Sequence, residues 1–187
     1  HRKSYATPLV IEAKGGPQVV STGSDWLYGY DPATGEELWK VKYGELGFSN
    51  VARPVAGDGM LFLSTGFGRT EMQGLKLNGR DAPAIVWRSK KGAPRMPSPI
   101  LVGAELYFVS DNGIVSCADA KTGQIHWQER IGGNHSASPL FAGGNLYFFS
   151  REGVTTVLKP GIEFVKVAEN QLDGGHMASA AVAGSAL

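Results

Sequence analysis

The sequence has little cysteine, no excess charge of either sign and no long hydrophobic run. Cys117 is the single cysteine among 187 residues, which excludes an internal disulfide and any metal site built from several cysteines. The 18 basic and 17 acidic residues leave a net charge of +1, which argues against a nucleic-acid partner. No apolar stretch approaches the roughly 20 residues of a membrane-spanning helix, so the sequence predicts no transmembrane segment.

The chain also lacks long stretches free of glycine and proline. The longest covers residues 162–173, whereas a helical domain of this size needs several longer ones. The 26 glycines are about twice the usual share and are spread along the chain. The composition therefore predicts short strands joined by many tight turns. The first residues are already strand-like and do not have the pattern of a signal peptide.

A repeated series of anchors runs along the whole chain. The segment "SPILVGAELYFVSDNGIVSCADAKTGQIHW" (98–127) matches "SPLFAGGNLYFFSREGVTTVLKPGIEFVKV" (138–167) in the order of its anchors. Two earlier units open in the same way, and a fifth opening begins at Ser179. The prolines of the four openings are 46, 45 and 40 residues apart: Pro8, Pro54, Pro99 and Pro139.

Each unit has four short apolar or alternating runs separated by turn residues, which predicts a four-stranded antiparallel sheet. In the third unit we expect strands over 99–102, 106–110, 114–118 and 124–129. Four strands in a unit of about 40 to 50 residues are typical of β-propeller blades; a β-sandwich is the alternative. The sequence thus predicts an all-β fold, a single partial propeller domain. Its blades are expected at about 5–45, 46–92, 93–133 and 134–173, with the first strand of a further blade at 176–187.

The turn between the third and fourth strands carries the most specific motif. It reads "YDPATGEELW" in the first unit and "ADAKTGQIHW" in the third. We expect the aspartate to bond the backbone N–H groups that follow it and the glycine to adopt a left-handed conformation. We expect the aromatic residue to be buried against the neighbouring blade. The structural residues of the motif and its two degenerate copies are Asp31, Thr34, Gly35, Trp39, Trp87, Asp119, Thr122, Gly123, Trp127 and Phe164.

This Asp-x-x-Thr-Gly-x-x-x-Trp pattern resembles the tryptophan-docking motif of pyrroloquinoline-quinone-like (BamB-like) β-propeller repeats. The family includes quinoprotein alcohol dehydrogenases, the BamB lipoprotein of outer-membrane assembly and secreted bacterial propellers of unassigned role. The sequence of the blades is most similar to that of the secreted propellers. The resemblance covers essentially the whole chain. It implies a periplasmic or secreted location and a larger ring of seven or eight blades.

In the enzymes of this family, the resemblance implies a quinone at the propeller axis, a bound calcium ion, a catalytic aspartate and a pair of adjacent cysteines. This chain has one cysteine, and its turn motif already uses Asp31 and Asp119. The other carboxylates lie singly in loops, namely Glu45, Asp58, Glu71 and Asp81. We therefore expect no pyrroloquinoline quinone, no calcium and no catalytic residue in this chain.

The connections between units show a second alignment. The position four residues before the proline holds a polar residue in each of them: Asn50, Arg95, His135 and His176. In a propeller these positions cluster near the mouth of the central channel, where one cation and two imidazoles favour an anionic or hydroxyl-rich ligand. The alternative is that a wet channel mouth simply tolerates polar residues. Two histidines without a third ligand do not predict a metal site.

These features favour a non-catalytic binding or scaffold module that acts outside the cytoplasm. The alternative is a fragment of a quinoprotein oxidoreductase. Four blades leave exposed sheet edges, so we expect contact with other blades of the same propeller or with a second copy. A protein, or the ligand at the channel mouth, is a further possible partner. The long loop 66–74 is either a partner-binding loop or a tolerated insertion.

Overall fold

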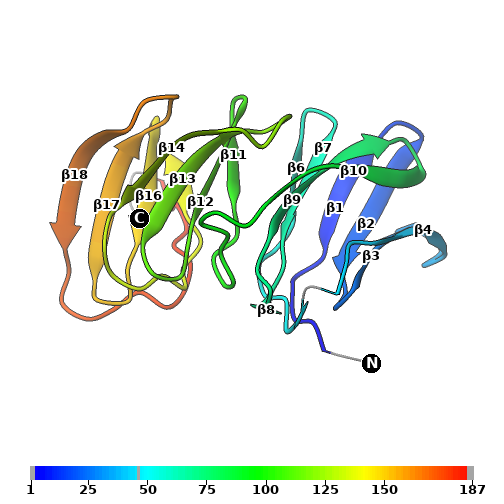
Figure 1. Ribbon diagram of the computed structural model, residues 1–187, viewed down its shortest axis with the longest axis horizontal. Helices are drawn as coiled ribbons and strands as arrows, with labels where there is room; N and C mark the ends of the chain where they lie inside the picture. The colour runs from blue at the N-terminus through cyan, green and yellow to red at the C-terminus, as the bar shows by residue number, and fades with distance from the viewer. Residues whose placement is uncertain (1–2, 46, 185–187) are drawn as a thin grey trace.

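The fold consists of four antiparallel sheets of four strands each, seen in a computed structural model that describes residues 3–45 and 47–184. Figure 1 shows the sheets stacked side by side in chain order, from blue to red. The prediction of an all-β fold with propeller blades is confirmed. The described residues form no helix long and apolar enough to cross a membrane.

In blade one each strand pairs with the next in sequence, and blade two has the same order except that β8, between β7 and β9, belongs to a separate sheet. Blade one contains β1 (Leu9–Ala13), β2 (Gly16–Thr22), β3 (Trp26–Tyr30) and β4 (Glu37–Lys42). Blade two contains β6 (Val55–Gly57), β7 (Met60–Ser64), β9 (Met72–Asn78) and β10 (Asp81–Ser89).

Blades three and four repeat this order. Blade three contains β11 (Ile100–Val102), β12 (Glu105–Val109), β13 (Ile114–Asp119) and β14 (Ile125–Arg130). Its strands begin and end within one residue of the ranges expected from the sequence. Blade four contains β15 (Leu140–Ala142), β16 (Asn145–Phe149), β17 (Val154–Lys159) and β18 (Val165–Gln171). Residues 176–184 form only an isolated bridge at Ala183, and the end of the expected further strand lies outside the described residues.

A short β-ribbon is added to blade two. It pairs β5 (Gly47–Phe48), in the connection from blade one, with β8 (Phe67–Gly68), inside the long loop between β7 and β9. The sequence marked this loop as long but did not predict the ribbon.

Three hydrophobic cores lie between consecutive blades. Each forms where the side chains of one sheet meet those of the next, so the middle strands are buried on both faces; all five residues of β7 are buried. The three cores contain, in chain order, Leu27 and Leu61, Phe62 and Phe108, and Tyr107 and Phe148, in each case one residue from either blade.

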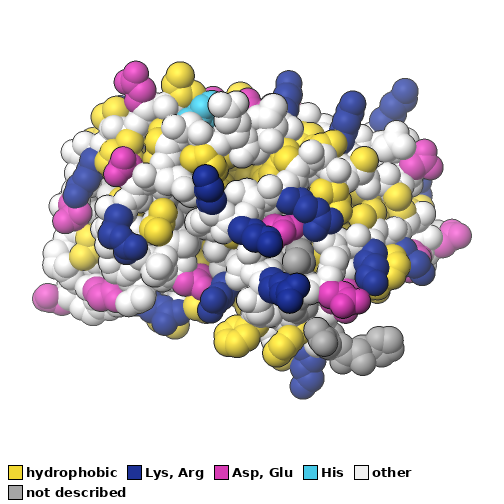
Figure 2. All heavy atoms as spheres, viewed as in Figure 1, with side chains coloured by type: hydrophobic (Ala, Val, Ile, Leu, Met, Phe, Trp, Pro, Cys, Tyr) yellow, Lys and Arg dark blue, Asp and Glu magenta, His cyan; other side chains and the backbone are white. Residues whose placement is uncertain are grey.

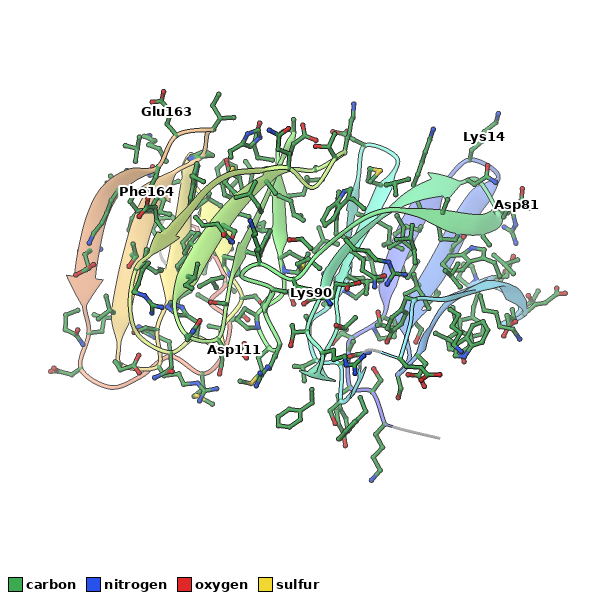
Figure 3. All side chains as sticks on the ribbon, viewed as in Figure 1. Lys14, Asp81, Lys90, Asp111, Glu163 and Phe164 are labelled. Carbon is green, nitrogen blue, oxygen red and sulfur yellow. The ribbon has the colours of Figure 1, made fainter. Side chains whose placement is uncertain are left out.

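The turns divide between two opposite faces. Lys14, in the turn before β2, and Asp81, the first residue of β10, lie toward the upper edge in Figure 3, whereas Asp111 lies at the lower edge. The connections between blades meet the lower turns: Asp111 Oδ1 accepts a hydrogen bond from Arg95 N at 3.1 Å, and Glu152 Oε2 accepts one from Asn134 N at 3.0 Å. We call this face the connector face. It comprises the connections 47–53, 93–98, 131–138 and 172–179 and the turns 23–25, 65–71, 111–113 and 151–153.

Candidate functional site

The two complete hairpin motifs have closely similar turn geometry. Asp31 Oδ1 accepts hydrogen bonds from the backbone N–H groups of Ala33 and Thr34, at 2.8 and 3.2 Å. Asp119 Oδ1 accepts them from Lys121 and Thr122, at 3.0 and 2.7 Å. The glycines that close the turns, Gly35 and Gly123, have φ angles of 74° and 72°, a conformation that glycine adopts without steric cost.

The aromatic residues of the motif contact the hairpin of the following blade. Trp87 Nε1 donates to Ala120 O at 2.9 Å, and its ring lies over Gly123. Trp127 Nε1 donates to Gly161 O at 3.1 Å. Both side chains are buried. The indole therefore joins consecutive blades by packing and by one hydrogen bond.

Trp39 and Phe164 complete the set in different ways. Trp39, also buried, donates through Nε1 to Gln18 Oε1 at 2.7 Å, and Gln18 Nε2 donates in turn to Gly79 O of blade two at 2.6 Å. Phe164 is half-buried and meets Trp127 edge-on, with ring centroids 5.2 Å apart. Blade four is the last four-stranded sheet among the described residues, and the ring contact of its aromatic residue is with the blade before it.

Asn50, the first of the four predicted channel-mouth residues, is fully buried. Its Nδ2 donates to Gly23 O at 2.6 Å and to the Tyr43 hydroxyl, and its Oδ1 accepts from Gly66 N. The amide thus joins a turn of blade one to the long loop of blade two. This structural role of Asn50 could not be predicted from the sequence, because its bonding partners Gly66 and Gly23 lie 16 and 27 residues away along the chain.

Arg95 is the most exposed of the four. Its side chain is 52% exposed; Nε lies 3.9 Å from Asp111 Oδ2 and donates to Thr70 Oγ1 at 3.3 Å. Its guanidinium carbon lies 5.7 Å from the centre of the Phe67 ring. Arg95 therefore presents a charged guanidinium group on the connector face, and its contacts with Asp111, Thr70 and Phe67 partly fix its position.

The two histidines are less available to solvent. His135 is buried, with Nε2 3.0 Å from Gly132 O; burial lowers the pKa of its imidazole, so the ring is neutral near pH 7. His176 is half-buried and packs edge-on against Phe149 at 5.7 Å. No hydrogen bond or ring contact between described side chains joins any two of the four residues.

A cleft of about 620 Å³ runs along the inner strands of blades two and three and the segments that lead into the inner strands of blades one and four. The residues that line it include those just before the prolines of successive units, and also the residues that follow Asn50, Arg95 and His135. Its polar lining consists of Thr7, Arg53, Ser98, Ser136, Ser138 and Ser179.

The serines of this cleft form a regular series. Arg53 N donates to Ser98 Oγ, Ser98 N to Ser138 Oγ and Ser138 N to Ser179 Oγ, each at 2.9 Å. Each hydroxyl thereby links its inner segment to that of the preceding blade and retains its own O–H donor. Our site prediction missed these residues, although the repeated Ser-Pro pair at Ser98 and Ser138 was a usable signal.

The described residues contain no group of three histidine, cysteine, aspartate or glutamate side chains placed to hold a metal ion. Cys117 is buried in the core between blades three and four, and burial raises the pKa of its thiol to about 11. A thiol with such a pKa is a poor nucleophile near neutral pH. Glu71, also buried, bonds Gln73 Nε2 at 2.8 Å and Arg88 at 3.0 Å.

Solved structures of propellers are similar to this fold. BamB from Moraxella catarrhalis superposes with a TM-score of 0.69 at 15% identity, over 96% of this chain and 54% of that protein. A quinohemoprotein alcohol dehydrogenase from Comamonas testosteroni gives 0.69 at 14%, over 93% and 35%. A europium-containing methanol dehydrogenase gives 0.63 at 12%, over 85% and 40%. The chain thus spans about half the length of that BamB and less of the dehydrogenases.

Sequence comparison identifies the family. No curated protein sequence matches the chain. The family profile described as outer membrane protein assembly factor BamB matches residues 6–158, which include the first three blades and most of the fourth. The chain therefore belongs to the BamB family of β-propeller repeat proteins.

Proposed function

We propose that this chain is part of a non-catalytic binding module, and that its ligand lies in the cleft along the inner strands. One observation carries the proposal: among the described residues that line this cleft, Arg53 is the only one with an ionisable side chain. Acid–base and nucleophilic catalysis need a group that exchanges a proton near the working pH, and a guanidinium stays protonated. The cleft can thus hold a ligand but offers no base that would activate a serine.

The donors of the cleft indicate the class of ligand. Ser98, Ser138 and Ser179 each accept a backbone hydrogen bond through Oγ and keep an O–H to donate. The Arg53 guanidinium has no hydrogen bond or ion pair with any described residue and suits a carboxylate or phosphate. Together these groups favour an anionic or hydroxyl-rich ligand, and we expect its binding to weaken with salt.

We propose that the predicted channel-mouth residues act at the rim of this cleft. Arg95 and His135 directly precede Met96 and Ser136, which line it. Arg95 has the charge and the exposure to contact an anionic ligand. Asn50, His135 and His176 are less exposed, so their part is to hold the connections in place.

The proposed location and partners follow from the family. A BamB-type propeller is expected to act outside the cytoplasm and to bind other proteins. On blade four, Val165 and Val167 of β18 are 47% and 50% exposed, and such a face suits other blades of the same propeller or a second copy.

The alternative, a fragment of a quinoprotein oxidoreductase, is supported by the likeness of the fold to two dehydrogenases. The residues of this chain do not fit pyrroloquinoline quinone with calcium, because the cleft is lined by no carboxylate and the single cysteine is buried. We therefore expect no saturable binding of the quinone in the presence of calcium. Quenching of tryptophan fluorescence measures this directly.

The proposal is tested by screening carboxylates, phosphates and oligosaccharides for those that raise the melting temperature of the chain. We expect a compound that binds the wild type and loses about tenfold in affinity on Arg53→Gln, the equivalent of one charge-assisted hydrogen bond. Arg130→Gln is the matched control, because Arg130 lies on the outer strand of blade three. Equal affinity for both variants in every compound found would contradict the proposed cleft.

A further inference from the structure

The β5–β8 ribbon presents two aromatic side chains to solvent. Phe48 and Phe67 are paired residues of the ribbon, 44% and 62% exposed, with ring centroids 6.2 Å apart. Figure 2 shows hydrophobic side chains projecting from the lower edge of the molecule, where β8 lies in Figure 1, with Lys and Arg side chains nearby. Blades three and four have short turns, 111–113 and 151–153, at the corresponding place, so within the described part of the chain only blade two carries such a ribbon.

Hydrogen bonds of the flanking residues tie the ribbon to the blades. Asn50 fixes one end through its bonds to Gly66 and Gly23. A side chain at Gly66 would come within 2.6 Å of Ser49 O, so the close approach of the two ribbon arms requires glycine. Thr65 Oγ1 fixes the loop by accepting from Glu71 N at 2.8 Å and donating to Arg69 O at 3.0 Å. Binding through a preorganised ribbon loses little conformational entropy.

The surroundings of the ribbon are cationic. The Arg95 guanidinium lies 5.7 Å from the Phe67 ring, Arg69 directly follows β8 and is exposed, and Ser49 N donates to Lys3 O at 2.6 Å, which places exposed Lys3 beside the ribbon. Two acids lie near the ribbon. Asp111 is partly buried, lies 3.9 Å from Arg95 Nε and accepts bonds from the backbone N–H groups of Arg95 and Met96, and Glu45, two residues before β5, is exposed and lies 3.7 Å from Lys42 Nζ. Three cations gather here in a chain whose net charge is only +1.

From this juxtaposition we infer that the ribbon is a membrane-binding element. Phe48 and Phe67 enter the interface of an anionic lipid bilayer while Lys3, Arg69 and Arg95 contact its headgroups. A protein interface typically surrounds its aromatic anchors with about 800 Å² of contact surface on each partner, whereas this aromatic pair projects from an edge of the molecule. Apolar side chains flanked by basic ones are the arrangement that binds at a bilayer surface. This inference does not rest on the ligand proposed for the cleft: Arg95 has a part in both, whereas Phe48, Phe67, Lys3 and Arg69 do not line the cleft.

Co-sedimentation with lipid vesicles tests the inference. We expect the chain to bind vesicles of phosphatidylcholine mixed with phosphatidylglycerol more tightly than vesicles of phosphatidylcholine alone, and added salt to weaken that binding. The double variant Phe48→Ser/Phe67→Ser should lose at least about tenfold in partitioning, and Arg69→Gln about fivefold. Phe141→Ser is the matched control, because Phe141 is 41% exposed on blade four, and it should bind as the wild type does.

A conservative variant measures insertion directly. Phe67→Trp should be quenched by phosphatidylglycerol vesicles with brominated acyl chains, beyond the quenching of the wild type, while Phe141→Trp should not. Equal quenching of both tryptophans, equal partitioning of the Phe48→Ser/Phe67→Ser and Phe141→Ser variants, or no binding to either kind of vesicle overturns the inference. Loss of a protein partner in the double phenylalanine variant, with vesicle binding unchanged, identifies a protein contact instead and also overturns it.

Discussion

The hairpin turns of blades one and three share one motif but differ in what covers them. Gly35 and Gly123 have nearly the same positive φ. A side chain at Gly123 would come within 2.5 Å of the Trp87 indole, whereas at Gly35 no described atom lies within 4 Å. The hairpin of the motif therefore forms the surface on which the aromatic residue of the preceding blade packs, and we call this surface the seat. That seat is filled in blade three and open in blade one.

The carboxylates of the two turns also differ in their third partner. Asp119 accepts a bond from the Thr122 hydroxyl of its own turn at 2.8 Å. Asp31 instead accepts one from Arg80 Nη2 of blade two at 2.5 Å. Blade three thus stabilises its turn internally and receives a tryptophan, whereas blade one ties its turn forward to the next blade by an ion pair.

Emptying the seat of blade three is expected to have the largest effect. Trp87→Ala should lower the free energy of unfolding by about 3–5 kcal/mol, the usual cost of truncating a buried large aromatic, because it removes the packing on Gly123 and the bond to Ala120. Urea denaturation measures the loss. The control is Trp26→Ala in blade one, whose side chain is only half-buried and should cost about 1–2 kcal/mol. Equal losses would contradict the role of the indole as a joint between blades.

A methyl group added to each glycine compares the two seats directly. Both substitutions strain a left-handed backbone, which costs about 1–2 kcal/mol. Gly123→Ala also drives a methyl group into Trp87, which adds about 1–3 kcal/mol of overpacking, whereas Gly35→Ala meets open space. We expect a total loss of about 2–5 kcal/mol at Gly123 against about 1–2 kcal/mol at Gly35. A larger loss at Gly35 would show that the open seat is filled in solution by another part of the molecule or by a second copy.

The threonines should separate the turns by a smaller amount. Thr122 Oγ1 donates to Asp119 and accepts from Gln124 N, whereas Thr34 Oγ1 accepts only from Glu36 N among the described residues. Thr122→Val should therefore cost about 1 kcal/mol, and Thr34→Val about half as much, since each exposed hydrogen bond contributes modestly. Melting temperatures of the two variants, measured side by side, provide the comparison. A greater loss for Thr34→Val would contradict the assignment of the hydroxyl bond to blade three.

The strands and hairpin turns could be predicted because their signals are local. In β13 and β14 the alternating residues and the Lys121–Thr122–Gly123 turn fix the hairpin within a few positions. Because the units repeat, the same pattern of four strands could be predicted for the other blades. The boundaries in blade three differ from expectation by one residue, as hydrogen-bond assignments of strand ends commonly do.

The parts of the site that depend on distant partners could not be predicted. Asn50 had the sequence context of an exposed loop residue but is buried, because its amide meets backbone groups of two other segments. The ribbon consists of two strands of two residues, too short for any alternation to reveal. Two serines of the cleft, Ser98 and Ser138, were visible as Ser-Pro pairs. Their function as links between blades depends on how the sheets are arranged in space.

The smallest effect we expect is a difference in how the two aspartates respond to acid and salt. The pKa of Asp31 is lowered first by the bond from Arg80 and then by the N–H of Ala33, and the pKa of Asp119 first by the Thr122 hydroxyl. Because each folded-state pKa is lowered, the unfolded chain takes up protons first as the pH falls. The stabilisation is therefore complete above the unfolded pKa of about 4 and is lost as the pH falls through the folded pKa.

Urea midpoints measured from pH 6 down to pH 3 should accordingly fall less steeply in Asp31→Asn and in Asp119→Asn than in the wild type, with pH values chosen around the ordinary aspartate pKa of about 4. Added salt should separate the variants. It screens the partly exposed ion pair of Asp31 with Arg80, so the advantage of the wild type over Asp31→Asn should shrink. The advantage over Asp119→Asn should persist, because bonds from a hydroxyl and from backbone N–H groups hold that carboxylate. Equal salt sensitivity would mean that Arg80 does not pair with Asp31 in solution, and that the turn of blade one is held by its own N–H groups alone.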